Sequence, residues 1–206
     1  MLEPRVLVLL GGEYHPFDEA EPFLGDLLAS LGLGMRATRD PAELGALTRD
    51  TTDLALVYTC RPDKLGEAAA GLVRFVEAGG GFLPWHSATA SFQTDYAFHQ
   101  LAGARFVMHP PRQSFIITPM RRPHPVIEGI DEFVVHDEVY VQDCIMGIDV
   151  HAVTNYLGKA LPMVYTREVG MGRVCYVAPG HDAEVWKMEP VRRLLCNAIE
   201  WCIKRR

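Results

Sequence analysis

GGGFLPWHSA, residues 79–88, is the stretch that decides the fold of this chain. Its glycines end a helix that the pattern predicts over Lys64–Ala78, where the apolar residues form one stripe. Phe82–Trp85 is then a short apolar run, typical of a strand buried on both faces. His86 follows at a sharp turn. A helix, a strand and a turn in such close succession indicate a chain that alternates α and β elements.

The same alternation extends back to the N-terminus. Its first strand is another continuous apolar run, which ends in a pair of glycines. The expected order is strand Arg5–Leu10, helix Glu19–Leu31, strand Met35–Thr38, helix Pro41–Leu47 with Asp40 as N-cap, strand Asp53–Thr59, helix Lys64–Ala78 and strand Phe82–Trp85. This β-α-β-α-β-α-β rhythm implies a parallel sheet with covering helices.

The second half of the chain is less regular. A helix is expected at Phe92–Leu101 and a closing helix at Pro190–Ile203. Strands are expected at Gln113–Thr118, Phe133–Val141, Val150–Thr154, Met163–Arg167 and Arg173–Ala178. Some of them are expected to form an antiparallel or irregular extension, whereas the last returns to the central sheet. The prediction is an α/β three-layer sandwich in a single domain over residues 1–206.

Composition and charge exclude several classes of protein. The chain has 206 residues, of which 49% are apolar and 22% charged, as in an ordinary globular protein. Its formal net charge is -6 and no basic patch is visible, which argues against nucleic-acid binding. No apolar stretch is long enough to span a bilayer, and the N-terminus lacks the features of a signal peptide. The five cysteines form no CxxC pair, so reduced thiols in a cytoplasmic protein are expected.

Three histidines follow predicted parallel strands. His15 comes after the first strand, His86 after Phe82–Trp85 and His181 after Arg173–Ala178. Ligands bind beyond the carboxyl ends of the strands in an open parallel sheet, so all three are expected on one rim. The alternative is that each histidine only caps a helix or bonds a backbone group.

His86 stands where folds of this type build a nucleophile elbow, a sharp turn between a strand and a helix. A glutaminase needs a cysteine at this turn, because a thiolate must attack the amide. None of the cysteines occupies it: Cys60 follows a different strand and Cys175 lies within one. We therefore predict that the protein releases no ammonia from glutamine.

Acidic and phenolic groups in the second half complete the candidate site. Strand alternation puts Glu138 and Tyr140 on one face and Asp137 on the other, so the first two are expected to point into a cleft. The alternative is an edge strand with a solvated polar face. We expect substrate contacts from His15, Trp85, Ser87 and Asp182. Asp182 belongs to a Gly-His-Asp sequence that would also suit a simple turn.

His86, Glu138 and His181, joined by His15, are predicted to converge on one site. Such a cluster could bind a divalent metal such as zinc through His86, Glu138 and His181. Alternatively, a His–Glu pair could move protons next to a sugar ketone while Tyr140 donates to a substrate oxygen. The spacing is not a compact metal motif such as HExxH, so both alternatives stay open.

These motifs together resemble the ThuA-like (trehalose utilisation) family. The similarity is carried, in order along most of the chain, by Gly11–Pro16, Gly79–Ser87, His124–Val126 with Gly129-Ile130, Asp137–Tyr140, Gly170–Arg173, Pro179–Asp182 and Asn197–Trp201. The resemblance implies a flavodoxin-like, class I glutamine amidotransferase-like fold that lacks the catalytic cysteine. It also implies a role in the utilisation of trehalose, related glycosides or oxidised (keto) sugars.

The sequence departs from the pattern of the family's namesake at three places. Pro16 stands where that pattern has a glutamate, Ser87-Ala88-Thr89 replaces a stretch with a second histidine, and Asp137-Glu138 replaces paired glutamates. These departures indicate a divergent branch. We expect an enzyme that acts on a small-molecule carbohydrate; the alternative is a non-catalytic sugar-binding or regulatory module.

A homodimer is also expected, because the second half carries more aromatic residues than a minimal core of this type needs. Some of them are expected to face a twofold partner. The residues in question are Phe92, Tyr96, Phe98, Phe106 and Phe115.

Overall fold

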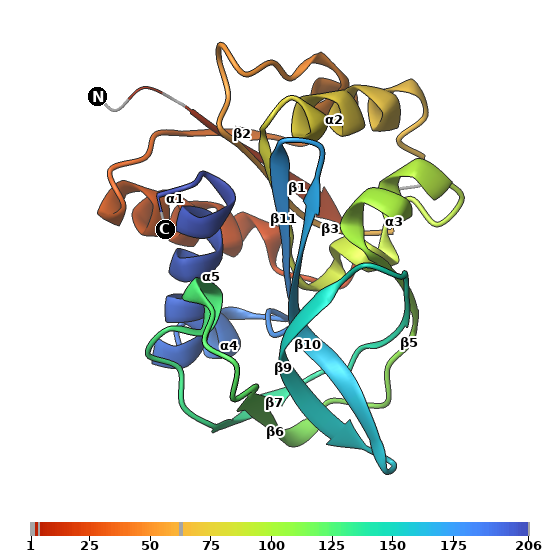
Figure 1. Ribbon diagram of the computed structural model, residues 1–206, viewed down its shortest axis with the longest axis vertical. Helices are drawn as coiled ribbons and strands as arrows, with labels where there is room; N and C mark the ends of the chain where they lie inside the picture. The colour runs from red at the N-terminus through yellow and green to blue at the C-terminus, as the bar shows by residue number, and fades with distance from the viewer. Residues whose placement is uncertain (1–2, 4, 62–63, 206) are drawn as a thin grey trace.

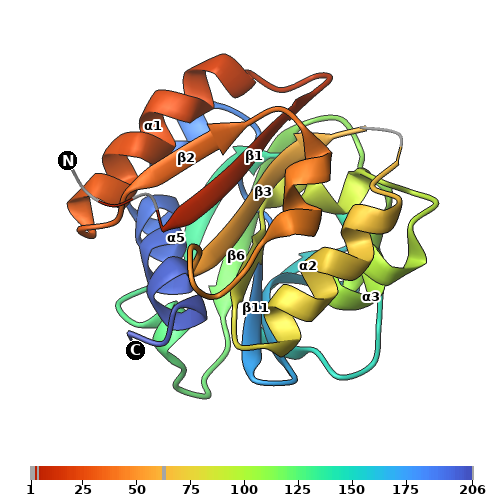
Figure 2. The ribbon, with the colours of Figure 1, turned by 90° about the horizontal axis from the view of Figure 1, so that it is seen from above.

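One mixed β-sheet runs through the molecule, with helices on both faces (Figures 1 and 2). The computed structural model describes residue 3 and residues 5–61 and 64–205. Within them the sheet has the strand order β2-β1-β3-β4-β11-β10-β9-β6-β7. Neighbours from β2 to β11 pair in parallel, and those from β11 to β7 pair antiparallel. The expected α/β fold, with a parallel sheet and an antiparallel extension, is confirmed.

The bounds of the strands show how the two halves differ. The parallel half consists of β1 (Val6–Gly12), β2 (Met35–Thr38), β3 (Leu54–Cys60), β4 (Gly81–Pro84) and β11 (Gly172–Val177). The antiparallel half consists of β10 (Lys159–Val169), β9 (Asp149–Tyr156), β6 (Gln113–Pro119) and β7 (Phe133–Asp137). A separate two-stranded sheet pairs β5 (Ala104–Met108) with β8 (Val141–Cys144), and the sequence analysis did not predict β5.

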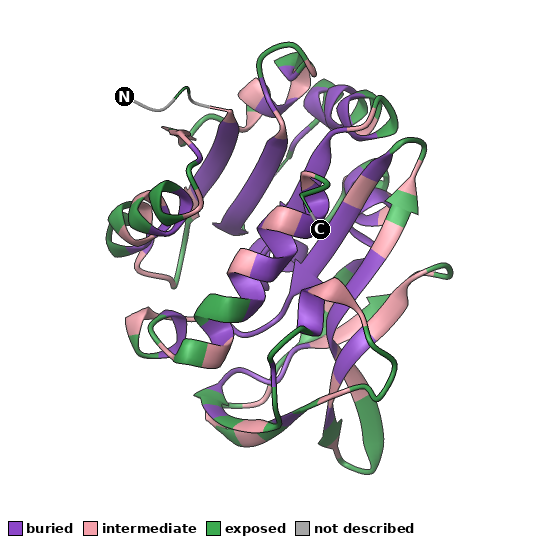
Figure 3. Cartoon of the chain, turned by 60° about the vertical axis from the view of Figure 1, so that its left-hand side comes forward, coloured by how far each residue is buried: buried purple, intermediate pink, exposed green. Residues whose placement is uncertain are grey.

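The parallel half is buried on both faces because side chains alternate along a strand. Val6, Val8 and Leu10 of β1 belong to one core with α1 (Phe17–Ser30) and α5 (Glu189–Cys202). Leu7 and Leu9 belong to the opposite core with the other helices. These are η1 (Pro41–Ala46), α2 (Glu67–Glu77) and α3 (Tyr96–Ala102). Figure 3 shows the central strands buried and the outer hairpins more exposed.

Two predicted helices begin later than the sequence pattern indicated. Gly66 has a φ of +59°, and α2 starts only after it. Phe92 has a φ of +51°, so it cannot open α3. Asp95, the residue before α3, accepts hydrogen bonds from the backbone nitrogens of Leu65 and Gly66 and thereby ties the two helix starts together.

The strand predicted over Phe133–Val141 is too long. β7 ends at Asp137 and β8 begins at Val141, and the two strands pair with different partners. Asp137 breaks the strand because its own carboxylate accepts the N–H of Glu138 at 2.7 Å. Glu138 and Tyr140 therefore lie on a crossing segment between sheets, and strand alternation does not set their directions.

Two of the aromatic residues expected at a dimer interface belong to the protomer's own core. Phe92 and Phe98 are fully buried against each other, with ring centroids 5.0 Å apart. These two rings are therefore not among those that could face a partner, because α3 and the loop before it belong to the core. Tyr96 is 75% exposed. Among the described residues no helix is long and apolar enough to cross a bilayer.

Candidate active site

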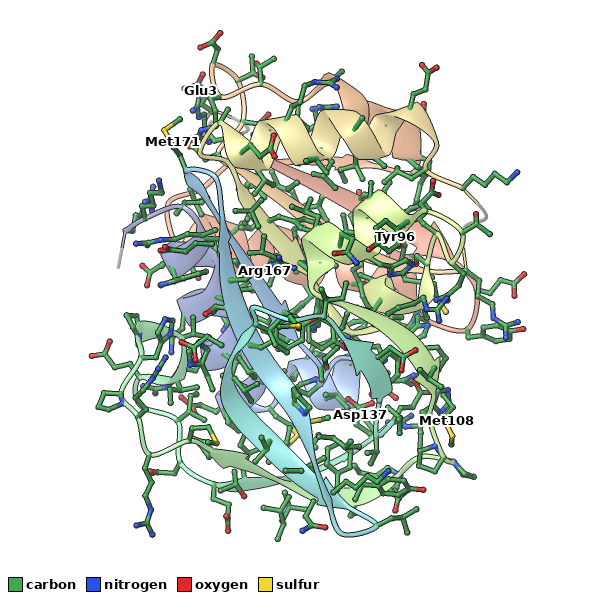
Figure 4. All side chains as sticks on the ribbon, turned by 45° about the vertical axis from the view of Figure 1, so that its right-hand side comes forward. Glu3, Tyr96, Met108, Asp137, Arg167 and Met171 are labelled. Carbon is green, nitrogen blue, oxygen red and sulfur yellow. The ribbon has the colours of Figure 1, made fainter. Side chains whose placement is uncertain are left out.

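Four side chains converge beyond the carboxyl ends of the parallel strands. His15 follows β1, His86 follows β4 and His181 follows β11, as the sequence predicted, while Glu138 comes from the crossing segment after β7. One ligand atom from each lies within 4.8 Å of the other three. Figure 4 shows Asp137, the neighbour of Glu138, well below Met171, which directly precedes β11.

His86 is held at a sharp turn between β4 and the short 3-10 helix η2 (His86–Ala90). Its φ is +47°, an uncommon conformation for a residue with a side chain. The imidazole is fully buried, and its Nδ1 lies 2.6 Å from the carbonyl oxygen of Ala178, so Nδ1 carries a proton and donates. Nε2 has no hydrogen-bond partner and lies 3.4 Å from Oε2 of Glu138. In a neutral ring, two atoms with lone pairs thus face each other.

His15 repeats this arrangement from the neighbouring loop. Its Nδ1 lies 3.1 Å from the carbonyl oxygen of Glu13, and its Nε2 is buried without a partner. Burial, together with the charges of His86 and His181, lowers the pKa of His15 to about 3. His15 is therefore neutral at ordinary pH, with its Nε2 lone pair directed inward.

Glu138 is the centre of the cluster. Its carboxylate oxygens lie 3.4 Å from Nε2 of His86, 3.4 Å from Nδ1 of His181 and 3.5 Å from Nε2 of His109. Burial opposes ionisation, but the contacts with His181 and His86 outweigh it and hold the pKa of Glu138 well below its usual range. For His86 burial opposes the charge as well, yet the negative charges of Asp137 and Glu138 raise its pKa.

Asp137 joins the two loops that carry the cluster. It is fully buried, and its Oδ1 accepts the N–H of Glu138 while its Oδ2 accepts the N–H of Gly180 at 2.8 Å. Gly180 precedes His181, so one carboxylate fixes the backbone beside two cluster members. The sequence analysis assigned Asp137 no role, because the strand pattern gave no signal that its carboxylate would bond backbone groups.

A pocket of about 440 Å³ opens onto the cluster. Tyr140, expected in the site, lines it and stacks on His109 with ring centroids 5.7 Å apart. Six further lining residues were not predicted as site residues: Tyr14, Cys60, Arg61, Ala90, Phe106 and His109. Tyr14 and Arg61 follow β1 and β3, so the rule that found His15 could also have found them. Burial raises the pKa of the Cys60 thiol to about 11, which keeps it protonated.

The remaining predicted substrate contacts, Trp85, Ser87 and Asp182, are not among the residues that line this pocket. Trp85 is fully buried and donates from Nε1 to the carbonyl oxygen of Pro179. Ser87 is fully buried, and its Oγ has no partner. Asp182 caps α4 (Ala183–Trp186) and forms an ion pair with Arg112 at 2.6 Å. Trp85 and Asp182 thus support the loops around His86 and His181, and their contact with substrate stays a prediction.

Comparison with known proteins assigns the family. The model of the ThuA family, described as trehalose utilisation, matches residues 5–202. The chain belongs to the ThuA family. The sequence matches no curated protein.

Solved structures share the fold of this ThuA-family chain at low sequence identity. A ThuA-like protein from Parabacteroides merdae has a TM-score of 0.84 and 16% identity, covering 98% of this chain and 91% of its own. One from Bacteroides uniformis has a TM-score of 0.76 and 17% identity, covering 98% and 93%. A β-galactosidase from Bacillus circulans sp. alkalophilus has a TM-score of 0.64 and 14% identity; the match covers 98% of this chain and 31% of that enzyme. At these identities the likeness shows the fold alone.

Proposed function

We propose that this ThuA-family protein is an enzyme of carbohydrate utilisation that acts on a keto-sugar or a related glycoside. The observation that carries the proposal is the set of buried ring nitrogens without hydrogen-bond partners, on His15, His86 and His181, around the carboxylate of Glu138. Buried polar atoms without partners are costly, so such a group is retained where a ligand completes it. The family's link to trehalose utilisation and the occurrence of this fold within a β-galactosidase support a carbohydrate as the substrate.

The cluster suits a divalent metal such as zinc. Histidines that bind a metal through one ring nitrogen usually donate the other N–H to a carbonyl or carboxylate, as His15 and His86 do to Glu13 and Ala178. Nε2 of both rings, Nδ1 of His181 and an oxygen of Glu138 would be the ligands. When bound, the metal would polarise a carbonyl oxygen of the sugar as a Lewis acid.

The protein's own residues would supply the proton transfers. In the alternative to metal binding, His86, whose pKa is raised, would hold a proton next to the carboxylate of Glu138, which suits enolisation, isomerisation or elimination next to a ketone. Burial raises the pKa of Tyr140 well above its usual range, so its hydroxyl stays protonated and can donate to a substrate oxygen. Glutaminase chemistry is not part of this proposal, because His86 occupies the turn and the Cys60 thiol is protonated.

Hydrogen exchange tests the proposal directly. The protein, with and without added zinc, is incubated with a panel of keto-sugars in D₂O and followed by proton NMR. We expect loss of the signal of a proton next to the ketone, or the appearance of a new product. Glu138→Gln should abolish this change. Glu132→Gln, which alters an exposed carboxylate that accepts from Thr118, is the matched control.

Binding of a keto-sugar without exchange or product would contradict the enzyme proposal. That result would favour the alternative, a non-catalytic sugar-binding or regulatory module. Ammonia release from glutamine that a thiol alkylator abolishes would contradict the proposed lack of glutaminase activity.

We further propose a homodimer that works in the cytoplasm. A cytoplasmic protein from Salmonella typhimurium has the same fold, with a TM-score of 0.73 and 12% identity, and Cys60, Cys144, Cys175 and Cys202 of this chain form no disulfide. Ile116 and Val134 pair across β6 and β7 and are 48% and 58% exposed, which would suit a second copy. A monomeric mass by light scattering at micromolar concentration would refute the dimer.

A further inference from the structure

Arg61 lines the pocket that opens onto the cluster, and few of its N–H donors have a hydrogen-bond partner. It follows β3 directly, and its guanidinium lies over the ring of Tyr14, 5.2 Å from the centroid. Nη1 donates to the Tyr14 hydroxyl at 3.3 Å. A guanidinium has five N–H donors in a planar fork, so most of them remain directed to solvent or to a ligand.

The charge of Arg61 is not balanced within the pocket. Glu138 is the one carboxylate among the described lining residues, and three imidazoles already surround it. Arg61 has no ion pair within 4.0 Å with any carboxylate of the described residues, which omit 62–63. Arg112, the arginine beside the His181 loop, differs because Asp182 neutralises it at 2.6 Å.

Arg61 and its partner Tyr14 both have an unfavourable backbone conformation. Tyr14 and Arg61 have φ angles of +67° and +58°, which place both residues in the left-handed region. Residues with side chains lose about 1 kcal/mol or more in that conformation. Together with His86 at +47°, three adjacent parallel strands, β1, β3 and β4, are each followed by such a residue, and all three residues lie at the same rim. Strain of this kind concentrates at binding and catalytic sites.

We infer that Arg61 binds an anionic group of the substrate, so that this pocket takes an acidic sugar derivative that carries a carboxylate or a phosphate. The inference rests on the proposed function, because it assigns the substrate to the same pocket. The anion would lie at the mouth against Arg61 while the sugar carbon to be modified faces Glu138. A pocket of about 440 Å³ is of the size that holds a small molecule.

Binding of three matched probes tests the assignment. D-Gluconate, D-glucose 6-phosphate and D-glucose share a carbon chain and differ in charge, and their affinities are measured by isothermal titration calorimetry on the full chain. We expect at least one anion to bind at least about tenfold more tightly than D-glucose, as a charged hydrogen-bonded pair would provide. Added salt should reduce this preference, because exposed charges are screened.

Variants separate Arg61 from a general effect of charge. Arg61→Met should lower the affinity for the preferred anion at least about tenfold and leave D-glucose nearly unchanged. Arg61→Lys should retain part of the preference. Arg74→Met, on the exposed side of α2, is the matched control and should change nothing.

Each outcome is decisive for the inference. Preference for gluconate alone identifies a carboxylate as the ligand, and preference for glucose 6-phosphate alone identifies a phosphate. Equal affinity for the three probes, no binding of either anion, or the same loss in Arg61→Met and Arg74→Met would overturn the inference. The exchange assay with keto-sugars reports on catalysis separately, so an anion preference without exchange would refute only the proposed function.

Discussion

The molecule contains two groups of buried and half-buried histidines, and they differ in what surrounds them. His15, His86 and His181 enclose the carboxylate of Glu138. His124 and His151 instead stack on each other, with ring centroids 3.8 Å apart and planes inclined by 15°. Nε2 of His151 bonds the hydroxyl of Thr166 at 2.7 Å, and its nearest carboxylate oxygen, on Asp149, lies 4.0 Å away.

The stacked pair has the properties of structural histidines. Nδ1 of His124 accepts the N–H of Val126 and caps the short helix η3 (Pro125–Ile127). Burial lowers the pKa of both rings, that of His151 to about 4, so both are neutral at ordinary pH. Nδ1 of His151 is buried without a partner, and the carboxylate of Asp149 lies 4.0 Å from the other ring nitrogen, Nε2. Proximity of histidines is therefore a weak sign of a site, whereas lone pairs that converge around a carboxylate are a strong one.

Removal of the carboxylate of Glu138 should give the largest difference in zinc affinity between the cluster and the stacked pair of His124 and His151. Glu138→Gln keeps the shape of the side chain but removes its charge, so the affinity of the metal-free protein for zinc should fall at least about 100-fold. Zinc titration against a competing chelator, followed by calorimetry, measures this change. His124→Asn, which retains a side-chain acceptor for the N–H of Val126, should leave the affinity within about twofold. If both variants bound zinc like the wild type, the cluster would not be a metal site.

Substitution of Asp137 should have the next largest effect on zinc affinity. Its carboxylate is not a member of the cluster but accepts the N–H groups of Glu138 and Gly180 and so fixes the backbone beside Glu138 and His181. Asp137→Asn replaces one acceptor oxygen by a donor that faces a backbone N–H, which should lower the free energy of unfolding by about 1–3 kcal/mol. Zinc affinity should fall about tenfold, since the loops of Glu138 and His181 lose their common anchor. Urea unfolding and the zinc titration measure the two effects.

The control for Asp137 is Asp143→Asn, which alters an exposed carboxylate paired with Arg105. It should change stability by only a few tenths of a kcal/mol, as exposed ion pairs do. A loss of stability in Asp137→Asn without any loss of zinc affinity would show that Asp137 is a purely structural residue.

Sequence patterns predicted the parallel half of the fold and three of the four cluster residues for one physical reason. Strands buried on both faces read as continuous apolar runs, and the residue after such a strand lies at the functional rim. His15, His86 and His181 all satisfy this rule. The family match over residues 5–202 and the shared fold of solved structures confirm the predicted family and fold class.

The prediction that Glu138 points into the site rested on strand alternation, and this premise is wrong. The expected strand alternation does not exist there, because Asp137 captures the N–H of Glu138 and ends β7. Such capture of backbone groups by a carboxylate depends on tertiary contacts, here on Gly180, and leaves no periodic signal in the sequence. Strand β5 was not predicted for a different reason. Four of its five residues are intermediate or exposed, and its short pairing with β8 is irregular, so it has no continuous apolar run.

Acid should distinguish the two groups of histidines through smaller effects on stability. An unperturbed histidine has a pKa near 6.5, and burial lowers the pKa of His151 to about 4 in the folded protein. Between these values the unfolded chain binds the proton and the folded chain does not. The contribution of neutral His151 is therefore fully present above about pH 6.5 and is lost as the pH falls toward 4, by at most about 1.4 kcal/mol per pH unit.

The variant His151→Gln tests this linkage, because glutamine does not titrate and can still bond the hydroxyl of Thr166. Urea unfolding at several values between pH 4 and 7 should give a shallower decrease of stability in the variant than in the wild type. Part of the decrease should persist, since His15 also has a lowered pKa, of about 3, whereas His86 contributes with the opposite sign because its pKa is raised. Zinc affinity at pH 7 should not change. Identical pH slopes in the two proteins would mean that His151 has the same pKa in the folded and the unfolded chain, and the contrast between the two groups would then fail.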